Sequence, residues 1–263
     1  TIRAVLNTKS ASVKSWTLKR YKEAANGRIS VELVPPGKKQ LELVSTENGS
    51  QFSDNLIYVA DKESLNGAGS IIFTAMRPDG IKVVKTFTFT ENSYKAGLNV
   101  SYENTGSSVI TEKPALSLSM ISKAENRSEL LHEMVYLSGK ELKRVHADKI
   151  KDEKAVSLGM DWAYLGDKYF ITAVIPSKAS DAEIYSKKLS DELYEAGIVF
   201  TPLQIKPGET KGMEYGLYFG PKEVGILKAA GSKLERAIDL GFFDLIAYPM
   251  LLSFKWMYEV IPN

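Results

Sequence analysis

The sequence predicts a mainly β fold, a sandwich of sheets, followed by a helical C-terminal segment. Between about residues 28 and 220, apolar and polar residues alternate with the period of two that half-buried strands require. Residues typical of turns separate these runs. After Gly220 the apolar spacing changes to three and four residues, which indicates helices. Strands do not alternate with helices, so a parallel α/β fold is disfavoured.

The alternation is clearest in four segments. Their inward-facing residues are Phe87 and Phe89; Leu98, Val100 and Tyr102; Leu116, Leu118 and Met120; and Met213, Tyr215, Leu217 and Phe219. Polar residues, mostly serine, threonine, asparagine and glutamate, occupy many of the intervening positions. Each segment is therefore expected to be a strand with one buried face.

Turn residues divide the strand region into short pieces. Pro78-Asp79-Gly80 lies between the apolar runs 71–76 and 81–90, so these two runs are expected to form a hairpin. Further reversals are expected at Asn26-Gly27, Pro36-Gly37, Asn48-Gly49, Asn66-Gly67, Gly139 and Pro207-Gly208.

The composition excludes several classes of function. The 263 residues carry a formal net charge of +2, with 34 basic and 32 acidic residues and no clustered basic stretch, which argues against nucleic-acid binding. The absence of cysteine excludes disulfides, thiol nucleophiles and cysteine-based metal sites. The sequence contains no run of 18 apolar residues of the kind that spans a bilayer.

The helical pattern begins at Pro221. Pro221 is expected in the first turn of a helix, where its missing N–H is not needed, and Gly241 is a candidate C-terminal cap. Val224, Leu227, Leu234 and Ile238 then lie on one face. We therefore expect residues 1–220 to form the β domain and residues 221–263 to form the helical segment.

An apolar stripe with many aromatic residues occupies the end of the chain. It consists of Phe242, Phe243, Ile246, Ala247, Met250, Leu251, Phe254, Met257, Tyr258 and Ile261, with Tyr248 and Trp256 beside it. One interpretation is a core helix packed on the β domain; the other is a helix lying in a membrane interface, where Trp and Tyr are favoured. Few basic residues are present, so an interface helix would need covalent attachment to a membrane-bound segment. Pro249 either starts a second helical piece or kinks a continuous one.

Six segments resemble the YidC family of membrane protein insertases. The sequence Leu217-Tyr218-Phe219-Gly220-Pro221-Lys222 is similar to the family's strand that ends in an aromatic-x-Gly-Pro-Lys/Glu motif. Residues 234–243 resemble the family stretch in which Asp239 and Gly241 occupy the matching places, although Leu240 and Phe242 replace the usual Tyr and Trp. Residues 246–251, with Pro249, and 254–258 resemble the motifs that follow. Upstream, residues 85–104 and 161–176 resemble a hairpin and a Trp-containing strand pair of the family.

This resemblance implies a fold and a function. The fold would be a β-supersandwich similar to galactose mutarotase-like sugar-binding domains, with C-terminal helices. The chain would be the large periplasmic domain between the first and second membrane helices of a protein that inserts and folds inner-membrane proteins, alone or with the Sec translocon. Implied partners are Sec accessory subunits, nascent membrane proteins and, through Phe242–Tyr258, the membrane surface. No nucleic acid, small-molecule substrate or cofactor is expected, and no catalytic or metal-binding residue is assigned.

The implied fold also raises an alternative, a carbohydrate-binding or mutarotase-like domain. Such an enzyme needs a general acid and a general base beside a sugar ring. The chain has two histidines, His132 and His146, and Glu133 would point away from His132 if both lay on a strand. We therefore expect a binding module and not an enzyme. An extended partner segment would bind either in a groove across the sheet or at a free sheet edge.

Overall fold

The computed structural model describes residues 1–23, 29–47, 50–53, 55–121, 132–146, 149–150, 153–190 and 192–238. The chain divides into two compact units, Thr1–Pro221 and Lys222–Asn263, and the first contains all the strands that the structure describes. The roles expected for residues 1–220 and for residues 221–263 remain predictions.

The strands of the first unit are short to medium in length. They are β1 Ile2–Asn7, β2 Ser12–Lys22, β3 Ser30–Glu32, β4 Val44–Glu47, β5 Ser50–Ser53, β6 Val59–Ala60, β7 Gly69–Met76, β8 Ile81–Phe89, β9 Lys95–Asn104, β10 Ile110–Glu112, β11 Ala115–Ile121, β12 Glu133–Ser138, β13 Glu141–His146, β14 Glu153–Gly166, β15 Phe170–Pro176, β16 Ser180–Lys188, β17 Leu193–Phe200, β18 Leu203–Ile205 and β19 Thr210–Pro221. In the second unit, helix α1 spans Val224–Ala230 and the 3-10 helix η2 spans Leu234–Ala237.

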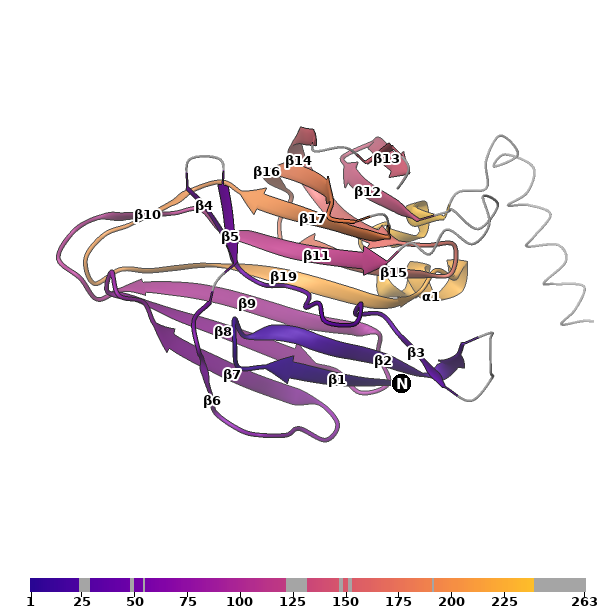
Figure 1. Cartoon of the computed structure of the whole chain (residues 1–263), viewed down its shortest axis with the longest axis horizontal. Helices are drawn as coiled ribbons and strands as arrows, with labels where there is room; N and C mark the ends of the chain where they lie inside the picture. The colour runs from indigo at the N-terminus through magenta and orange to yellow at the C-terminus, as the bar shows by residue number, and fades with distance from the viewer. Residues whose placement is uncertain are drawn as a thin grey trace, which may run out of the picture. The chain divides into compact units, whose positions relative to one another are not determined.

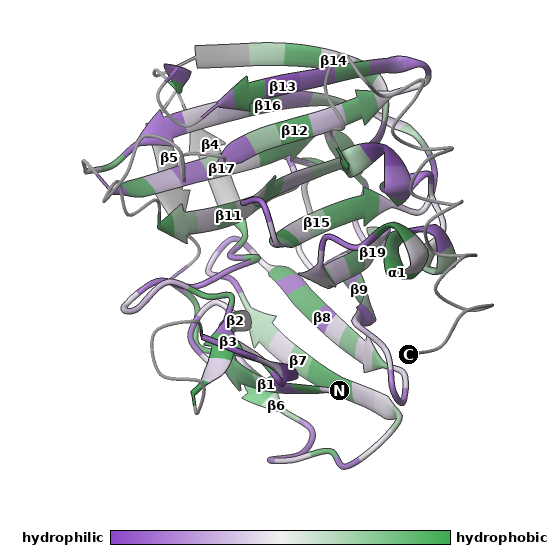
Figure 2. Ribbon diagram, turned by 90° about the vertical axis from the view of Figure 1, so that its right-hand side faces the viewer, coloured by the Kyte–Doolittle hydropathy of each residue, from purple (hydrophilic) through white to green (hydrophobic). Residues whose placement is uncertain are grey.

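Two antiparallel sheets make up most of the β unit (Figure 1). Among the described residues, the large sheet has the order β11-β17-β16-β14-β15-β19-β9-β8-β7-β6, and β12 and β13 extend it from β14. The small sheet has the order β1-β2-β3. The mainly β sandwich predicted from the alternation is confirmed, and Figure 2 shows the alternation of hydrophobic and hydrophilic residues along β8.

The predicted hairpin around Pro78-Asp79-Gly80 is confirmed. Strand β7 pairs with β8 from Gly69 opposite Phe89 to Met76 opposite Lys82. Gly80 has a φ of 82°, a left-handed conformation, and a Cβ there would lie 3.3 Å from the backbone of Gly106. Both the conformation and the close approach favour glycine.

Strands β1 and β2 lie before the region in which the sequence pattern indicates strands. The sequence pattern did not indicate β2 because this strand contains a bulge. Val5 lies opposite Ser15 and Leu6 lies opposite Val13, so Lys14 is an extra residue. Val13 and Trp16 are consequently both buried although they are three positions apart. The bulge breaks the period of two that would have marked the strand.

Trp16 joins the small sheet to the large one. Its fully buried ring packs on Phe219 of β19 with ring centroids 4.9 Å apart, and it lies 6.0 Å from Phe89 of β8. Its indole Nε1–H donates to the carbonyl oxygen of Phe219 at 3.1 Å. The interface between the sheets thus combines aromatic packing with a specific buried hydrogen bond.

Lys85 makes a second connection to the segments around the small sheet. It lies on the inward face of β8 beside Phe87, and its side chain is fully buried. Its Nζ donates to the carbonyl oxygens of Ser10 at 3.1 Å and Leu41 at 2.8 Å. A buried ammonium group is costly unless its N–H groups are hydrogen-bonded. These two bonds therefore favour the arrangement in which the segments containing Ser10 and Leu41 pack over β8.

The start of the helical segment differs from the expectation in two respects. Pro221 is the last residue of β19, opposite Phe170 of β15, and it is not in the first turn of a helix. The N–H of Phe219 points toward β9 and donates to Tyr94 O. An N–H at position 221 would point to the same side, but β9 begins at Lys95, so this position lies beyond the start of β9. A residue without an N–H is tolerated at such a strand end. Helix α1 begins at Val224 and stops at Gly231, so Leu234 belongs to η2 and Ile238 is extended.

Candidate functional site

The apolar stripe predicted to meet the membrane lies outside the described residues. This applies to Phe242, Phe243, Ile246, Met250, Leu251, Phe254, Trp256, Met257 and Tyr258, and to the motif residues Asp239, Gly241 and Pro249. Their assignment stays a prediction. Of the motif residues, the structure describes Gly220, Pro221 and Lys222.

Gly220 occupies a crowded position near the end of β19. A Cβ on this residue would lie 2.8 Å from the Cβ of Tyr94 and 3.2 Å from the Tyr218 ring. The rings of Tyr94 and Tyr218 meet edge to face with centroids 6.5 Å apart, and the Tyr218 hydroxyl donates to Pro221 O at 2.7 Å. The motif therefore supports packing at this strand end, and neither Gly220 nor Pro221 supplies a chemical group to a site.

The histidines do not form an acid–base pair with Glu133. The buried carboxylate of Glu133 accepts hydrogen bonds from the Tyr164 hydroxyl at 2.6 Å and from Arg144 Nη1 at 2.9 Å. His132 precedes β12, and burial lowers its pKa, an effect that Asp167 opposes. His146 lies opposite Glu133 in the β12–β13 ladder. Over the described residues, no group of three His, Cys, Asp or Glu side chains is placed to hold a metal ion.

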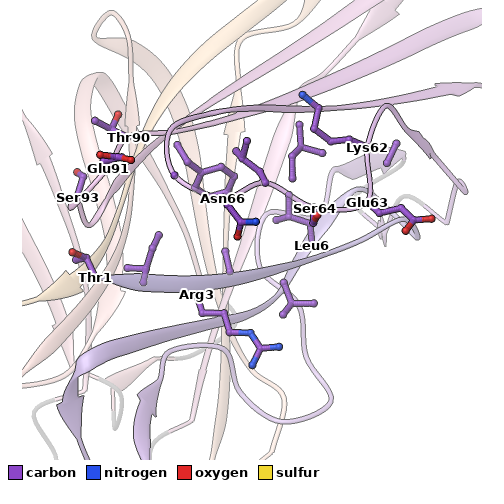
Figure 3. A pocket seen from close by; sticks show the side chains of 18 of the residues that line it. Thr1, Arg3, Leu6, Lys62, Glu63, Ser64, Asn66, Thr90, Glu91 and Ser93 are labelled. Carbon is purple, nitrogen blue, oxygen red and sulfur yellow. The ribbon is translucent and has the colours of Figure 1, made fainter.

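A groove lies between strand β1 and the Asp61–Gly67 loop (Figure 3). Its volume is about 940 Å³. β1 forms one wall, the loop forms the other, and the turn Thr90–Ser93 lies at one end. In Figure 3, Asn66 lies on the loop side of β1, Thr90, Glu91 and Ser93 gather near Thr1, and Lys62 and Glu63 lie toward the other end.

Hydrogen bonds hold the loop wall in place. Asp61 accepts from the Ile72 N–H at 2.8 Å, and its own N–H donates to Ile72 O at 2.9 Å. The bond from Ile72, followed by the nearby Lys62 ammonium, keeps the pKa of Asp61 below its ordinary value. At the other end of the loop, Gly67 lies against the Glu91 carboxylate, where a Cβ would be 2.8 Å from Oε1.

The groove exists because β1 and the 56–67 segment are joined at one end and then separate. Ser10 N–H donates to Leu56 O at 2.8 Å and Tyr58 N–H donates to Thr8 O at 2.9 Å. At the other end, the Thr1 hydroxyl contacts the exposed side chain of Asn92, in the Thr90–Ser93 turn, at 3.4 Å. The floor includes Ile71, Phe73 and Phe89, so the groove is apolar at depth and polar at its rim.

A second cavity of about 670 Å³ lies at another end of the β unit. Its lining includes Pro35 and Pro36, Met120, and the β14–β15 turn around Tyr169. His132 also lines it, whereas Glu133 does not.

Sequence reasoning named neither cavity. A groove of this kind depends on where two distant segments diverge, and only the turn at Asn66-Gly67 marked one of the walls.

Searched over the described residues, no helix has the length and apolar character needed to cross a bilayer.

Comparison with known proteins identifies the chain. A model of the YidC periplasmic domain matches residues 1–253. The chain belongs to this family. The YidC resemblance predicted from the motifs is thereby confirmed.

Curated YidC proteins match nearly the whole chain. The membrane protein insertase YidC of Geotalea daltonii is 32% identical over 272 residues, which cover 99% of this chain and 51% of that protein. The YidC proteins of Geobacter metallireducens and Geobacter sulfurreducens are 32% and 31% identical and cover 99% and 98% of the chain. The chain spans about half the length of the curated relatives it matches.

Solved structures show the same fold at low sequence identity. A galactose mutarotase-like protein from Lactobacillus casei matches with a TM-score of 0.59 and 8% identity, covering 83% of this chain and 97% of that one. A galactose mutarotase related enzyme from Lactobacillus acidophilus has a TM-score of 0.55 and 12% identity, covering 83% and 94%. At these identities the likeness establishes the fold alone. The mutarotase-like β-supersandwich predicted for the YidC domain is confirmed.

Membership of the YidC periplasmic family also fixes class and location. The domain belongs to a non-enzymatic family and lies on the periplasmic side of the inner membrane. It is this membership that excludes catalysis.

Proposed function

We propose that this domain docks partner proteins and positions them for a YidC membrane protein insertase. The whole protein would insert and fold inner-membrane proteins, alone or with the Sec translocon. The observation that carries the proposal is the match of residues 1–253 to the YidC periplasmic domain, together with relatives of 31–32% identity that bear the insertase name.

The β unit suits a docking role. It combines two tightly joined sheets with grooves of about 940 and 670 Å³. Rigid walls reduce the ordering that a partner must impose on binding, which favours affinity. The proposed partners are Sec accessory subunits and nascent membrane proteins.

The helical segment, residues 221–263, has a separate proposed role. Its stripe from Phe242 to Ile261 would lie in the membrane interface and hold the β unit, residues 1–220, near the bilayer. The aromatic content of the stripe supports this proposal, since Trp and Tyr favour the interface, and the periplasmic location places the domain beside a membrane.

Co-flotation with phospholipid vesicles tests the helical segment. We expect chain 1–263 to float with vesicles and a chain that ends at residue 240 to remain in the dense fraction. A matched variant, Phe254→Ser with Trp256→Ser, keeps the length and should float less than the unchanged chain. Equal partitioning of all three chains would contradict the interface role.

Co-purification tests the docking role in the full-length insertase. We expect Sec accessory subunits to co-purify with the complete protein and to be lost when residues 1–220 are removed. As a control, the same residues are replaced by the Lactobacillus casei mutarotase-like protein, which supplies the fold without this sequence. Retention of the Sec subunits by either altered protein would contradict docking by this domain.

A further inference from the structure

We propose that the groove between β1 and the Asp61–Gly67 loop binds an extended polypeptide segment of a partner protein, which adds to β1 as a fourth strand of the small sheet. The inference rests on the proposed docking function and names the mode of recognition. Strand addition derives affinity from main-chain hydrogen bonds and specificity from alternate side chains.

The register of β1 leaves backbone groups facing the groove. Lys19 N–H donates to Thr1 O at 3.0 Å, so the pair Thr1–Lys19 is hydrogen-bonded and the next pair, Ile2–Leu18, is not. By the same alternation, Ala4 turns its N–H and C=O away from β2. Among the described residues, no hydrogen bond reaches the backbone of Ile2 or Ala4 on that side.

Several other edges in the described part of the two sheets are covered, charged or short. The β11 edge is covered, since Leu41 N–H donates to Ser117 O at 2.7 Å. The β13 edge carries the exposed ion pair of Glu141 and Lys143. Strand β3 has three residues and β6 has two. Proteins blunt their edges by such means, whereas β1 has six residues and one charged side chain.

The groove has room for the added strand. The five residues from Ile2 to Leu6 span about 17 Å at the usual rise of a strand, and the groove beside them encloses about 940 Å³. The backbone bonds at Thr8 and Ser10 close one end, and at the other end the described contact is the one of 3.4 Å between Thr1 and Asn92 of the Thr90–Ser93 turn. A partner segment therefore enters from the open face.

The side chains define what kind of segment fits. Residues of the added strand that point inward meet the apolar floor of Ile71, Phe73 and Phe89. Arg3 is exposed on the outer face. A residue of the added strand opposite Arg3 would form a non-hydrogen-bonded pair with it, which is the type of pair in which side chains lie closest. No carboxylate lies on β1. The occupant is thus a segment with apolar residues at alternate positions and an acidic residue opposite Arg3.

Exposed apolar side chains surround the same edge. Val5 on β1 is 36% exposed, and Ile57 and Val59, at the beginning of the loop wall, are 68% and 75% exposed. Apolar side chains gathered around a sheet edge favour a protein partner over a hydrophilic ligand such as a sugar.

Hydrogen exchange of the 263-residue chain, followed by NMR, tests the proposal. The probe is the acetylated, amidated peptide Thr-Val-Glu-Val-Thr-Val; comparison peptides carry Lys in place of Glu or Pro in place of the central Val. We expect the Glu peptide to slow exchange of the Ile2 and Ala4 amides. The Lys peptide should bind more weakly, and the Pro peptide should give no protection because it cannot complete the ladder.

Variants of β1 separate strand addition from other binding. Ala4→Pro removes the outward N–H and leaves the bonds to β2 in place, so the Kd for the Glu peptide should rise by about five- to tenfold. Ala4→Ser keeps the N–H and should bind as the unchanged chain does. Arg3→Glu alters an exposed side chain and should reverse the preference between the Glu and Lys peptides, which gives a readout even if Ala4→Pro does not fold.

Several results would overturn the proposal. One is the absence of protection at Ile2 and Ala4 at the highest soluble peptide concentration; another is an unchanged peptide preference in Arg3→Glu. Protection without peptide that falls on dilution would identify a second copy as the occupant, and protection independent of dilution would identify another part of the chain. Failure of the docking function has a different readout: Sec subunits would still co-purify after removal of residues 1–220, whatever the peptide does.

Discussion

At the residue scale, the lack of space around Gly220 explains why the motif has a glycine at this position. The sequence marks this residue only through the family resemblance, and the structure supplies the reason: the Tyr94 side chain lies directly over it. The reason lay beyond sequence reasoning because Tyr94 is 126 positions away and reaches β19 only through the fold.

Replacement of Gly220 by alanine should therefore destabilise the β unit. The added Cβ would lie 2.8 Å from Tyr94 Cβ, so strand or ring must shift, at a cost of about 1–3 kcal/mol. The midpoint of urea unfolding measures this. Gly225→Ala is a matched control within α1, where no atom lies within 4 Å and alanine favours the helix. Equal midpoints for Gly220→Ala and the unchanged chain would refute the packing explanation.

Glu195 gives a pH-dependent prediction at the same scale. It lies on β17, where burial raises its pKa; Glu42 adds to the increase, while Lys38 and Lys187 oppose it. A carboxyl with a raised folded-state pKa favours folding at low pH, and that contribution is lost as pH rises through the folded pKa.

Glu195→Gln, which stays neutral, should consequently unfold at a higher urea concentration than the unchanged chain at pH 8. The difference should shrink toward pH 4, where the native carboxyl is protonated as well. Urea midpoints at pH 4, 6 and 8 provide the measurement. Glu141→Gln, on the exposed part of β13, should show no gain. A constant difference across the three pH values would mean that titration of Glu195 is not the cause.

At the scale of elements, the sequence predicted where strands lie better than which strands pair with one another. Local alternation indicated 71–76 and 81–90, and the short turn between them left only one pairing, which the ladder shows. The place of β19 between β15 and β9 could not be predicted, since both ladders join residues distant in sequence. Likewise, the free edge of β1 follows from the divergence of two segments about 55 residues apart. The groove is a consequence of tertiary arrangement, so no local pattern encodes it.

Two buried tryptophans offer a test of how the sheets are joined. Trp16 and Trp162 are both fully buried, but Trp16 Nε1 donates to Phe219 O, whereas Trp162 Nε1 has no partner among the described atoms. Trp→Phe at either position removes similar volume. Only at position 16 does it also leave a buried carbonyl without its donor, so Trp16→Phe should cost about 1 kcal/mol more. Urea unfolding of both variants measures the difference, and a larger loss for Trp162→Phe would contradict the role of the bond.

At the scale of the whole molecule, one fold serves different purposes. The β unit shares its architecture with proteins named for galactose mutarotase, yet Glu133 and His146 do not line the cavity that His132 lines. His132 lines the second cavity, His146 lies in the β12–β13 ladder, and the Glu133 carboxylate is bonded to Arg144 and Tyr164. The sequence predicted a domain that is not an enzyme, and membership of the YidC periplasmic family confirms this. The alternation of strand faces does not apply to His132 and Glu133, because His132 precedes β12.

The domain should therefore show no saturable binding of hexoses. A ligand that binds the folded state raises the melting temperature in proportion to RT ln(1 + [L]/Kd), so a millimolar site would be visible at about 100 mM sugar. We expect thermal unfolding of the 263-residue chain to be unchanged by galactose and glucose beyond the general effect of sucrose, which accounts for solvent exclusion. The Lactobacillus casei mutarotase-like protein is the comparison for the fold. A saturable shift with galactose that disappears in His132→Gln would place a sugar site in the second cavity and require a carbohydrate-binding role beside docking.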